Sequence, residues 1–135
     1  MNREIKFRMW SDYDKKMIHW NELLEKNLAN IFTIPSYNKW LMQYTGLHDE
    51  DGKEIYGGDI IEFSYDVFTG NFDTKVGKGI VEFIDGAFYI KPFEIEGKKI
   101  KDIDNEEWFL IYTVNIDTLK VIGNITDNPE LLGGE

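Results

Sequence analysis

Apolar and charged side chains alternate over residues 4–9, within a predicted strand from about Glu4 to Trp10. A period of two is typical of a strand with one buried face. Turn-forming residues follow at 11–14 and an apolar segment resumes at 16–20, so the pattern predicts an N-terminal hairpin. From Asn21, a good N-cap residue, the apolar spacing becomes helical and predicts one short helix that ends near Asn30.

Three further segments have the pattern of hairpins. The clearest is GIVEFIDGAFYI at 79–90, in which two β-rich runs flank an Asp-Gly pair at 85–86 that permits the positive φ angles of a type I′ turn. A second Asp-Gly pair at 51–52 predicts a slightly longer or bulged hairpin. The runs at 108–116 and 119–125 predict a third hairpin.

Six or more short strands with little helix predict a mainly β protein, a β-dominated α+β fold. The Gly57-Gly58-Asp59 turn lies directly before an Ile-rich strand, where the glycines permit a sharp reversal and the aspartate can bond backbone amides. Small closed barrels begin a long curved strand in this way, and closure removes exposed strand edges. We therefore expect a small SH3-like barrel with an N-terminal hairpin and one or two short helices.

The length of the chain is that of one domain, and the sequence contains no repeat or linker. We expect a single compact domain at 1–132, with the N-terminal hairpin and short helix in 1–40 and the barrel core in 41–127. A frayed tail is expected at 133–135. The Asn-Pro-Glu sequence at 128–130 predicts a single helical turn that closes the fold.

Composition narrows the function classes. The formal net charge of −10 disfavours non-specific electrostatic binding to nucleic acid or to an anionic membrane. The absence of cysteine excludes disulfides, thiolate metal sites and cysteine nucleophiles. Early charges interrupt any signal-peptide core, and no apolar stretch is long enough to span a bilayer, so we expect a cytoplasmic protein without membrane contact.

Two acidic runs supply the candidate metal ligands. The run at 48–51 fits the middle of a calcium loop but lacks carboxylates at both ends. The run with Asp102, Asp104 and Glu106 lacks the required glycine and the final carboxylate. We therefore expect no metal and no cofactor, and we interpret the first run as a charged, solvated hairpin tip.

Asp85, Glu96 and Lys98 resemble a magnesium-dependent nuclease motif, in which two carboxylates hold the ion and a lysine stabilises the attacking water. The Asp-Gly turn already uses Asp85, and the other two residues flank a glycine in a predicted loop. The chain has no G-x-S-x-G motif and only two histidines, so no hydrolytic triad is visible either. We expect no catalytic residues.

The N-terminal hairpin mixes basic and aromatic residues, a combination that can follow a nucleic-acid strand. Interleaved acids offset much of this charge, and alternation assigns Phe7 to the buried face, so a solvated strand face explains the pattern better. Direct nucleic-acid binding is therefore not expected. The residues expected at a partner surface are Tyr44 and Tyr56, since tyrosine is favoured at interfaces, together with Asp59.

Four sequence blocks resemble a known family. They are REIKFRMW at 3–10, LMQYTGLHDEDGKEIYGGDII at 41–61, GIVEFIDGAFYI at 79–90 and VIGNITDNPELL at 121–132. In order and spacing they are similar to the YopX-type proteins of bacteriophages and prophages, although Gly57 stands where a bulkier or acidic residue is expected. The resemblance implies a β-rich fold with an SH3-type barrel, and it implies no activity and no catalytic residue.

Three function classes remain open. The leading hypothesis is a non-enzymatic phage or prophage accessory protein that binds an unidentified protein or copies of itself. The second is an acidic inhibitor that imitates nucleic acid and blocks a host DNA-binding protein, because residues 57–135 hold 7 basic and 16 acidic side chains. The third is a magnesium-dependent nuclease that uses Asp85, Glu96 and Lys98.

Overall fold

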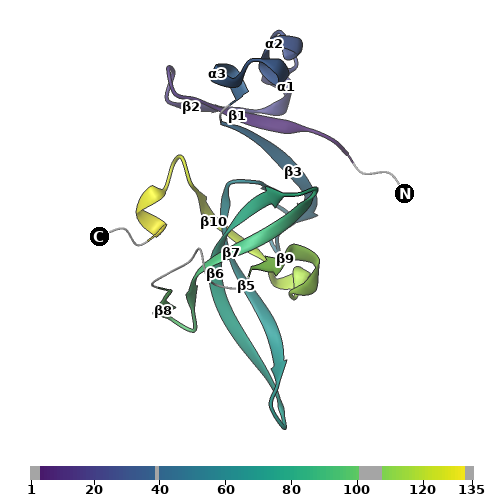
Figure 1. Ribbon diagram of the computed structural model, residues 1–135, viewed down its shortest axis with the longest axis vertical. Helices are drawn as coiled ribbons and strands as arrows, with labels where there is room; N and C mark the ends of the chain where they lie inside the picture. Colours follow the sequence, from purple (N-terminus) through teal and green to yellow (C-terminus); the bar gives the residue numbers. More distant parts are fainter. Residues whose placement is uncertain (1–3, 39, 101–107, 133–135) are drawn as a thin grey trace.

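The computed structural model describes residues 4–38, 40–100 and 108–132 (Figure 1). The fold is mainly β, with ten strands in two antiparallel sheets and a few short helices in the described ranges. No helix in these ranges is long and apolar enough to cross a membrane. The tail expected at 133–135 and the acidic run at 102–106 lie outside the described residues.

The first sheet has four strands in the order β2-β1-β3-β4. Their bounds are β1 Phe7–Ser11, β2 Lys16–Ile18, β3 Leu41–His48 and β4 Glu54–Tyr56. Trp10 pairs with Met17, which confirms the predicted N-terminal hairpin. His48 pairs with Glu54 across the Asp-Gly pair at 51–52, and the register shift in this pair of strands confirms a bulged hairpin.

Three short helices pack on the N-terminal hairpin, where one or two were expected. They are α1 Trp20–Leu23, α2 Leu28–Thr33 and α3 Pro35–Asn38. The predicted single helix from Asn21 to Asn30 is therefore wrong. Asn27 interrupts it, because its side chain accepts a hydrogen bond from the Asn30 amide at 3.1 Å and caps a new helix. Leu23 is fully buried while Leu24 is half-exposed, so the apolar face differs from the one that the spacing predicted.

The second sheet has six strands in the order β10-β5-β6-β7-β8, with β9 paired to β7. Their bounds are β5 Asp59–Phe68, β6 Phe72–Ile84, β7 Ala87–Ile95, β8 Lys98–Lys99, β9 Phe109–Leu110 and β10 Lys120–Asn124. Ile84 pairs with Ala87, and Asp85 and Gly86 between them have φ angles of 51° and 88°. The predicted tight hairpin is confirmed, because these angles are those of a type I′ turn.

The predicted hairpin between 108–116 and 119–125 is wrong. Strand β9 pairs with β7, whereas β10 pairs with β5. The chain between them turns inward, because Ile111 and Val114 are buried in the core. The 3₁₀ turns of the C-terminal part are η1 Ile111–Thr113, η2 Ile116–Thr118 and η3 Pro129–Leu132. The last of these confirms the helical turn predicted at 128–130.

The hydrophobic core has separate parts at the two ends of the molecule. The large core lies on one face of the second sheet and contains Ile55, Ile61, Phe63, Val81, Phe88, Ile90, Ile111, Val114 and Leu119. A small core under the helices contains Ile18, Leu23 and Ile31. A third cluster, which we call the junction, contains Met42, Tyr44 and Tyr56 from β3 and β4. Burial of these apolar surfaces is the main force that stabilises each part of the fold.

Strands β5 and β6 continue beyond the rest of the second sheet as a two-stranded arm. The register of β6 with β7 begins at Gly77 and that of β5 with β10 ends at Glu62, whereas β5 and β6 pair with each other out to Phe68 and Phe72. We call residues 65–75 the arm. Figure 1 shows the arm projecting from the end of the molecule opposite the helices.

Gly79 lies within the second sheet at a point where a side chain has no room. A Cβ atom there would lie 2.6 Å from Cγ2 of Ile90 and 2.8 Å from the carbonyl oxygen of Lys91. The backbone of β7 cannot retreat without disturbing its pairing with β6. We therefore expect Gly79→Ala to lower the free energy of unfolding by about 1–3 kcal/mol, measured by urea denaturation.

Gly57→Ala is the matched control for this substitution. A Cβ atom at Gly57 would meet nothing closer than 3.8 Å, so there is room for a larger residue at this position. We expect the free energy of unfolding to change by no more than about 0.5 kcal/mol. Equal losses in the two variants would contradict the steric explanation.

Candidate functional site

A buried ion pair connects the N-terminal hairpin to the second sheet. Arg8 on β1 donates from Nη2 to Oδ1 of Asp59 at 2.6 Å. The other carboxylate oxygen accepts from the Tyr56 amide at 2.8 Å, which confirms the predicted bond within the turn. The guanidinium also lies 4.6 Å from the centre of the Tyr56 ring. Burial raises the pKa of Asp59, and the guanidinium and the amide oppose this rise.

Tyr44, Tyr56 and Asp59, the residues expected at a partner surface, all lie in the interior. Their exposed fractions are 3%, 7% and 1%. The centres of the two tyrosine rings lie 5.5 Å apart, and both residues belong to the junction. The expectation needs correction, because these side chains hold the two ends of the molecule together and are not presented to a partner.

Lys6 and Glu54 form an ion pair beside the junction. The Tyr56 hydroxyl donates to Glu54 at 3.2 Å. The hydrogen bond to Glu54 raises the pKa of Lys6, and burial raises the pKa of Tyr56 to about 12. Burial also acts to raise the pKa of Glu54, but Lys6 outweighs it and lowers that pKa. The three groups are thus held as ammonium, phenol and carboxylate, a state that stabilises the junction and is not poised for acid–base catalysis.

Asp49 connects the β3–β4 turn to β10. Its Oδ1 accepts from the amides of Asp51 at 3.0 Å and Lys53 at 2.8 Å, and its Oδ2 accepts from the Val121 amide at 2.9 Å. Burial acts to raise the pKa of Asp49, but the three amides outweigh it and hold the pKa below its ordinary value. The interpretation as a solvated tip is correct for Glu50 and Asp51 and wrong for Asp49, which is 7% exposed.

Asp85, Glu96 and Lys98 do not converge. Asp85 lies in the β6–β7 turn, while the other two residues follow the far end of β7. The nine residues of that strand span roughly 30 Å. Glu96 instead accepts a hydrogen bond from the Val76 amide at 2.9 Å. No three His, Asp or Glu side chains of the described ranges come close enough to hold a metal ion, so the geometry gives the nuclease hypothesis no support.

One row of facing residues in the second sheet alternates lysines with glutamates. Facing positions form one row across five strands, namely Lys120, Glu62, Lys78, Glu94 and Lys99. The Nζ atoms of Lys78 and Lys99 lie 3.6 Å and 3.5 Å from the Glu94 carboxylate. Opposite charges that face each other across strands stabilise a sheet by about 0.2–1 kcal/mol per pair. An imitation of nucleic acid needs carboxylates without interleaved cations, so this face does not fit the mimic hypothesis.

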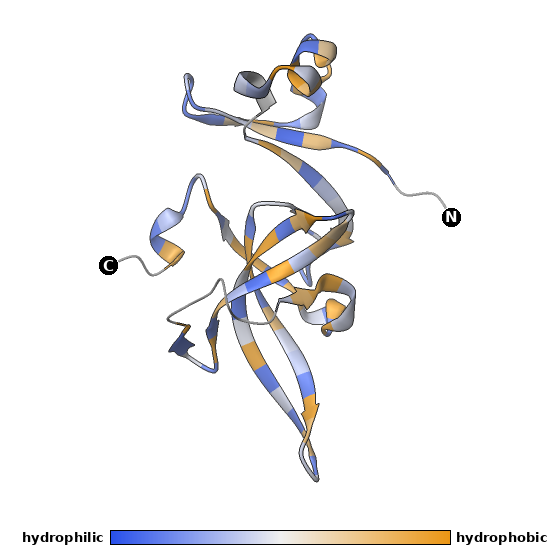
Figure 2. Ribbon diagram, viewed as in Figure 1, coloured by the Kyte–Doolittle hydropathy of each residue, from blue (hydrophilic) through white to orange (hydrophobic). Residues whose placement is uncertain are grey.

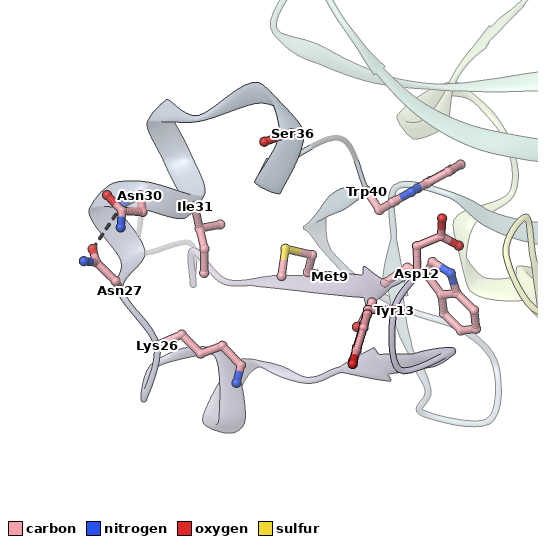
Figure 3. A pocket seen from close by; sticks show the side chains of 11 residues that line it. Met9, Asp12, Tyr13, Lys26, Asn27, Asn30, Ile31, Ser36 and Trp40 are labelled. Atoms are coloured by element: carbon pink, nitrogen blue, oxygen red, sulfur yellow. Dashed lines mark hydrogen bonds between the residues drawn. The ribbon is translucent and has the colours of Figure 1, made fainter.

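A pocket of about 460 Å³ lies between the N-terminal hairpin and α2 (Figure 3). Met9 from β1 and Ile31 from α2 point into it, Trp40 borders one end and Lys26 borders the other. We call this cavity the N-terminal pocket. Its volume is in the range of sites that hold small molecules or inserted side chains.

The tip of the arm presents two phenylalanines to solvent. Phe68 and Phe72 are 64% and 81% exposed, face each other across the two strands and have ring centres 4.9 Å apart. Val76, on the same face of β6, is 50% exposed. Figure 2 shows hydrophobic colour near the end of the arm. Cross-strand aromatic pairs stabilise hairpins, but a contiguous exposed apolar patch at a projecting tip is typical of an interaction surface.

Sequence reasoning missed both the arm and the ion pair between Arg8 and Asp59. A signal for the arm is present, because the segment FTGNF at 68–72 places a glycine between two β-rich runs, and Gly70 has a φ of 100°. No local signal marks the ion pair. Its two residues lie 51 positions apart.

Together these features define a β-rich protein with two sheets, a buried ion pair between Arg8 and Asp59, and a projecting arm with an aromatic tip. The profile of the YopX family, described as YopX protein, matches residues 6–133, so the chain belongs to the YopX family, as its four sequence blocks indicate. Among solved structures, protein EF1440 from Enterococcus faecalis is similar, with a TM-score of 0.55 at 22% identity. The match covers 97% of this chain and 99% of that chain, and it shows the fold. No curated protein matches the chain.

Proposed function

We propose that the protein is a non-enzymatic phage or prophage accessory protein that binds another protein in the cytoplasm through the tip of its arm. The exposed pair of Phe68 and Phe72 carries this proposal. Aromatic residues are enriched in the cores of protein interfaces and among the residues that dominate binding energy. A projecting hairpin can insert such residues into a recess that a flat surface cannot reach.

We further infer that β3 to β7 and β10 form a small barrel of the SH3 type, which serves as a rigid base for the arm. The support is the β3–β4 hairpin, the three consecutive strands β5 to β7, the 3₁₀ turn before β10 and the large core between them. The base of the arm is fixed on both strands. Asn115 donates its amide to the Ser64 carbonyl at 2.9 Å, and Glu96 donates its amide to the Val76 carbonyl at 2.8 Å.

The test compares the wild-type protein with the double variant Phe68→Ser/Phe72→Ser in affinity capture from host lysate, with and without phage induction. We expect the variant to capture about tenfold less, or still less, of a stoichiometric partner. Truncation of aromatic residues at the centre of an interface lowers binding affinity by at least this factor. Tyr112→Ser is the matched control, since Tyr112 is an aromatic residue 51% exposed outside the arm. Equal capture by all three proteins would overturn the proposal.

A further inference from the structure

The arm and the N-terminal pocket lie at opposite ends of the molecule (Figure 1). We infer that the arm of one copy docks into the N-terminal pocket of a second copy, and that two copies form a closed dimer with two such contacts. This inference rests on the proposed function, because it names the partner of the same arm. Three observations carry it: an apolar match, a charge match and the placement of the two surfaces.

The apolar match is between the exposed phenyl rings at the tip of the arm and the apolar side chains that line the pocket. Phe68 and Phe72 face each other in the β5–β6 register and therefore share one face of the arm. Met9 and Ile31 point into the pocket, whose volume of about 460 Å³ leaves room for an inserted pair of phenyl rings (Figure 3). Insertion would remove from water the most exposed aromatic pair of the arm, which is the driving force of such a contact.

The charge match lies directly beside the apolar one. Asp66 precedes Phe68 by two residues, so it lies on the same face of the arm, roughly 7 Å away along the strand. Its carboxylate accepts from the Thr74 hydroxyl at 2.8 Å and has no ion-pair partner in the part of the chain that the structure describes. Lys26 at one end of the pocket also has none within the described ranges, and the carboxylate that lines the pocket, Asp12, lies near Trp40 at the other end. With the tip inserted, the Asp66 carboxylate meets the Lys26 ammonium, and such complementary charges fix the register of an interface.

The placement of the two surfaces sets the symmetry. An arm cannot reach the pocket of its own chain, because the body of the molecule separates them (Figure 1). Two copies that lie antiparallel bring each arm to the pocket of the other around one two-fold axis. This arrangement is closed, so it ends at a dimer and does not extend into a filament.

Sedimentation velocity of the full chain over a wide range of protein concentration tests the inference. We expect a monomer–dimer equilibrium for the wild-type protein. Phe68→Ser/Phe72→Ser, Lys26→Glu and Asp66→Lys should each raise the dissociation constant by about tenfold or more. Asp73→Lys is the matched control, because it makes the same charge change on the opposite face of the arm, and it should alter the constant by less than about twofold.

Two further samples distinguish docking from misfolding. The double variant Lys26→Glu/Asp66→Lys restores the opposite charges and should recover the wild-type dissociation constant within about threefold. A mixture of Phe68→Ser/Phe72→Ser with Lys26→Glu should form a heterodimer, because one chain keeps an intact arm and the other an intact pocket. Circular dichroism melts of each variant verify the fold.

A wild-type protein that stays monomeric, or a dimer that none of these variants weakens, would overturn the inference. The proposed function is tested separately, by affinity capture of a host or phage protein. A monomer that captures such a protein through Phe68 and Phe72 supports the proposed function and identifies a different partner for the arm. A wild-type protein that stays monomeric, and whose capture of other proteins is unchanged by Phe68→Ser/Phe72→Ser, would refute both proposals.

Discussion

Replacing Arg8 by methionine is expected to lower the free energy of unfolding by about 3–5 kcal/mol, because it leaves a buried carboxylate without its cation. Asp59 is 1% exposed, and among the described residues only the Tyr56 amide would still donate a hydrogen bond to it. Methionine retains the unbranched apolar stem of arginine, so the loss measures mainly the missing charge. Urea denaturation at neutral pH provides the measurement.

The double variant Arg8→Met/Asp59→Asn should recover much of this loss. Asparagine removes the buried charge and keeps an acceptor for the Tyr56 amide, and removal of both members of a buried ion pair is often close to neutral. Lys16→Met is the matched control, because Lys16 lies 3.1 Å from Glu22 in an exposed pair and should contribute less than about 1 kcal/mol. A similarly small effect of Arg8→Met would show that water reaches Asp59 and that the junction is open.

Asp49→Ala is expected to lower the free energy of unfolding by about 3 kcal/mol. Three backbone amides, those of Asp51, Lys53 and Val121, would lose a charged acceptor. A hydrogen bond to a charged group contributes about 1.5–3 kcal/mol, and water replaces part of this loss at a site near the surface. The same loss would weaken the contact between the β3–β4 turn and β10, which would then depend on the bond from the Glu50 amide to the Leu119 carbonyl at 2.8 Å.

The contribution of Asp49 should depend on pH. Its pKa is lower in the folded protein than in the unfolded chain, where the ordinary value is about 3.9. Its stabilisation is therefore fully present above the unfolded pKa and is lost as the pH falls through the folded pKa. Urea denaturation over a pH series should show the difference between wild type and Asp49→Ala narrowing below about pH 4. The exposed Asp51 supplies the control Asp51→Ala, and a difference that stayed constant into the acid range would contradict this assignment.

Local chemistry made the turns of this protein predictable. The Asp-Gly pair at 85–86 adopts the backbone angles that the two residue types favour, and the bulged hairpin at 51–52 follows the same rule. Asp59 bonds the Tyr56 amide three residues away, as turn chemistry predicts. The failure at the first helix was also local in origin, since Asn27 could equally continue a helix or cap a new one, and spacing does not distinguish these outcomes.

The sequence by itself determined the mainly β class, three of the hairpin turns and the family, because each depends on residues that are neighbours along the chain. Only the tertiary structure decided what those residues contact. Asp49 binds the amide of Val121, 72 positions away, and Arg8 lies beside Asp59 across the junction. The exposed tip at 68–72 likewise follows from where the neighbouring strands end. Such contacts depend on the register and path of several strands at once, and no periodicity of a single segment encodes that geometry.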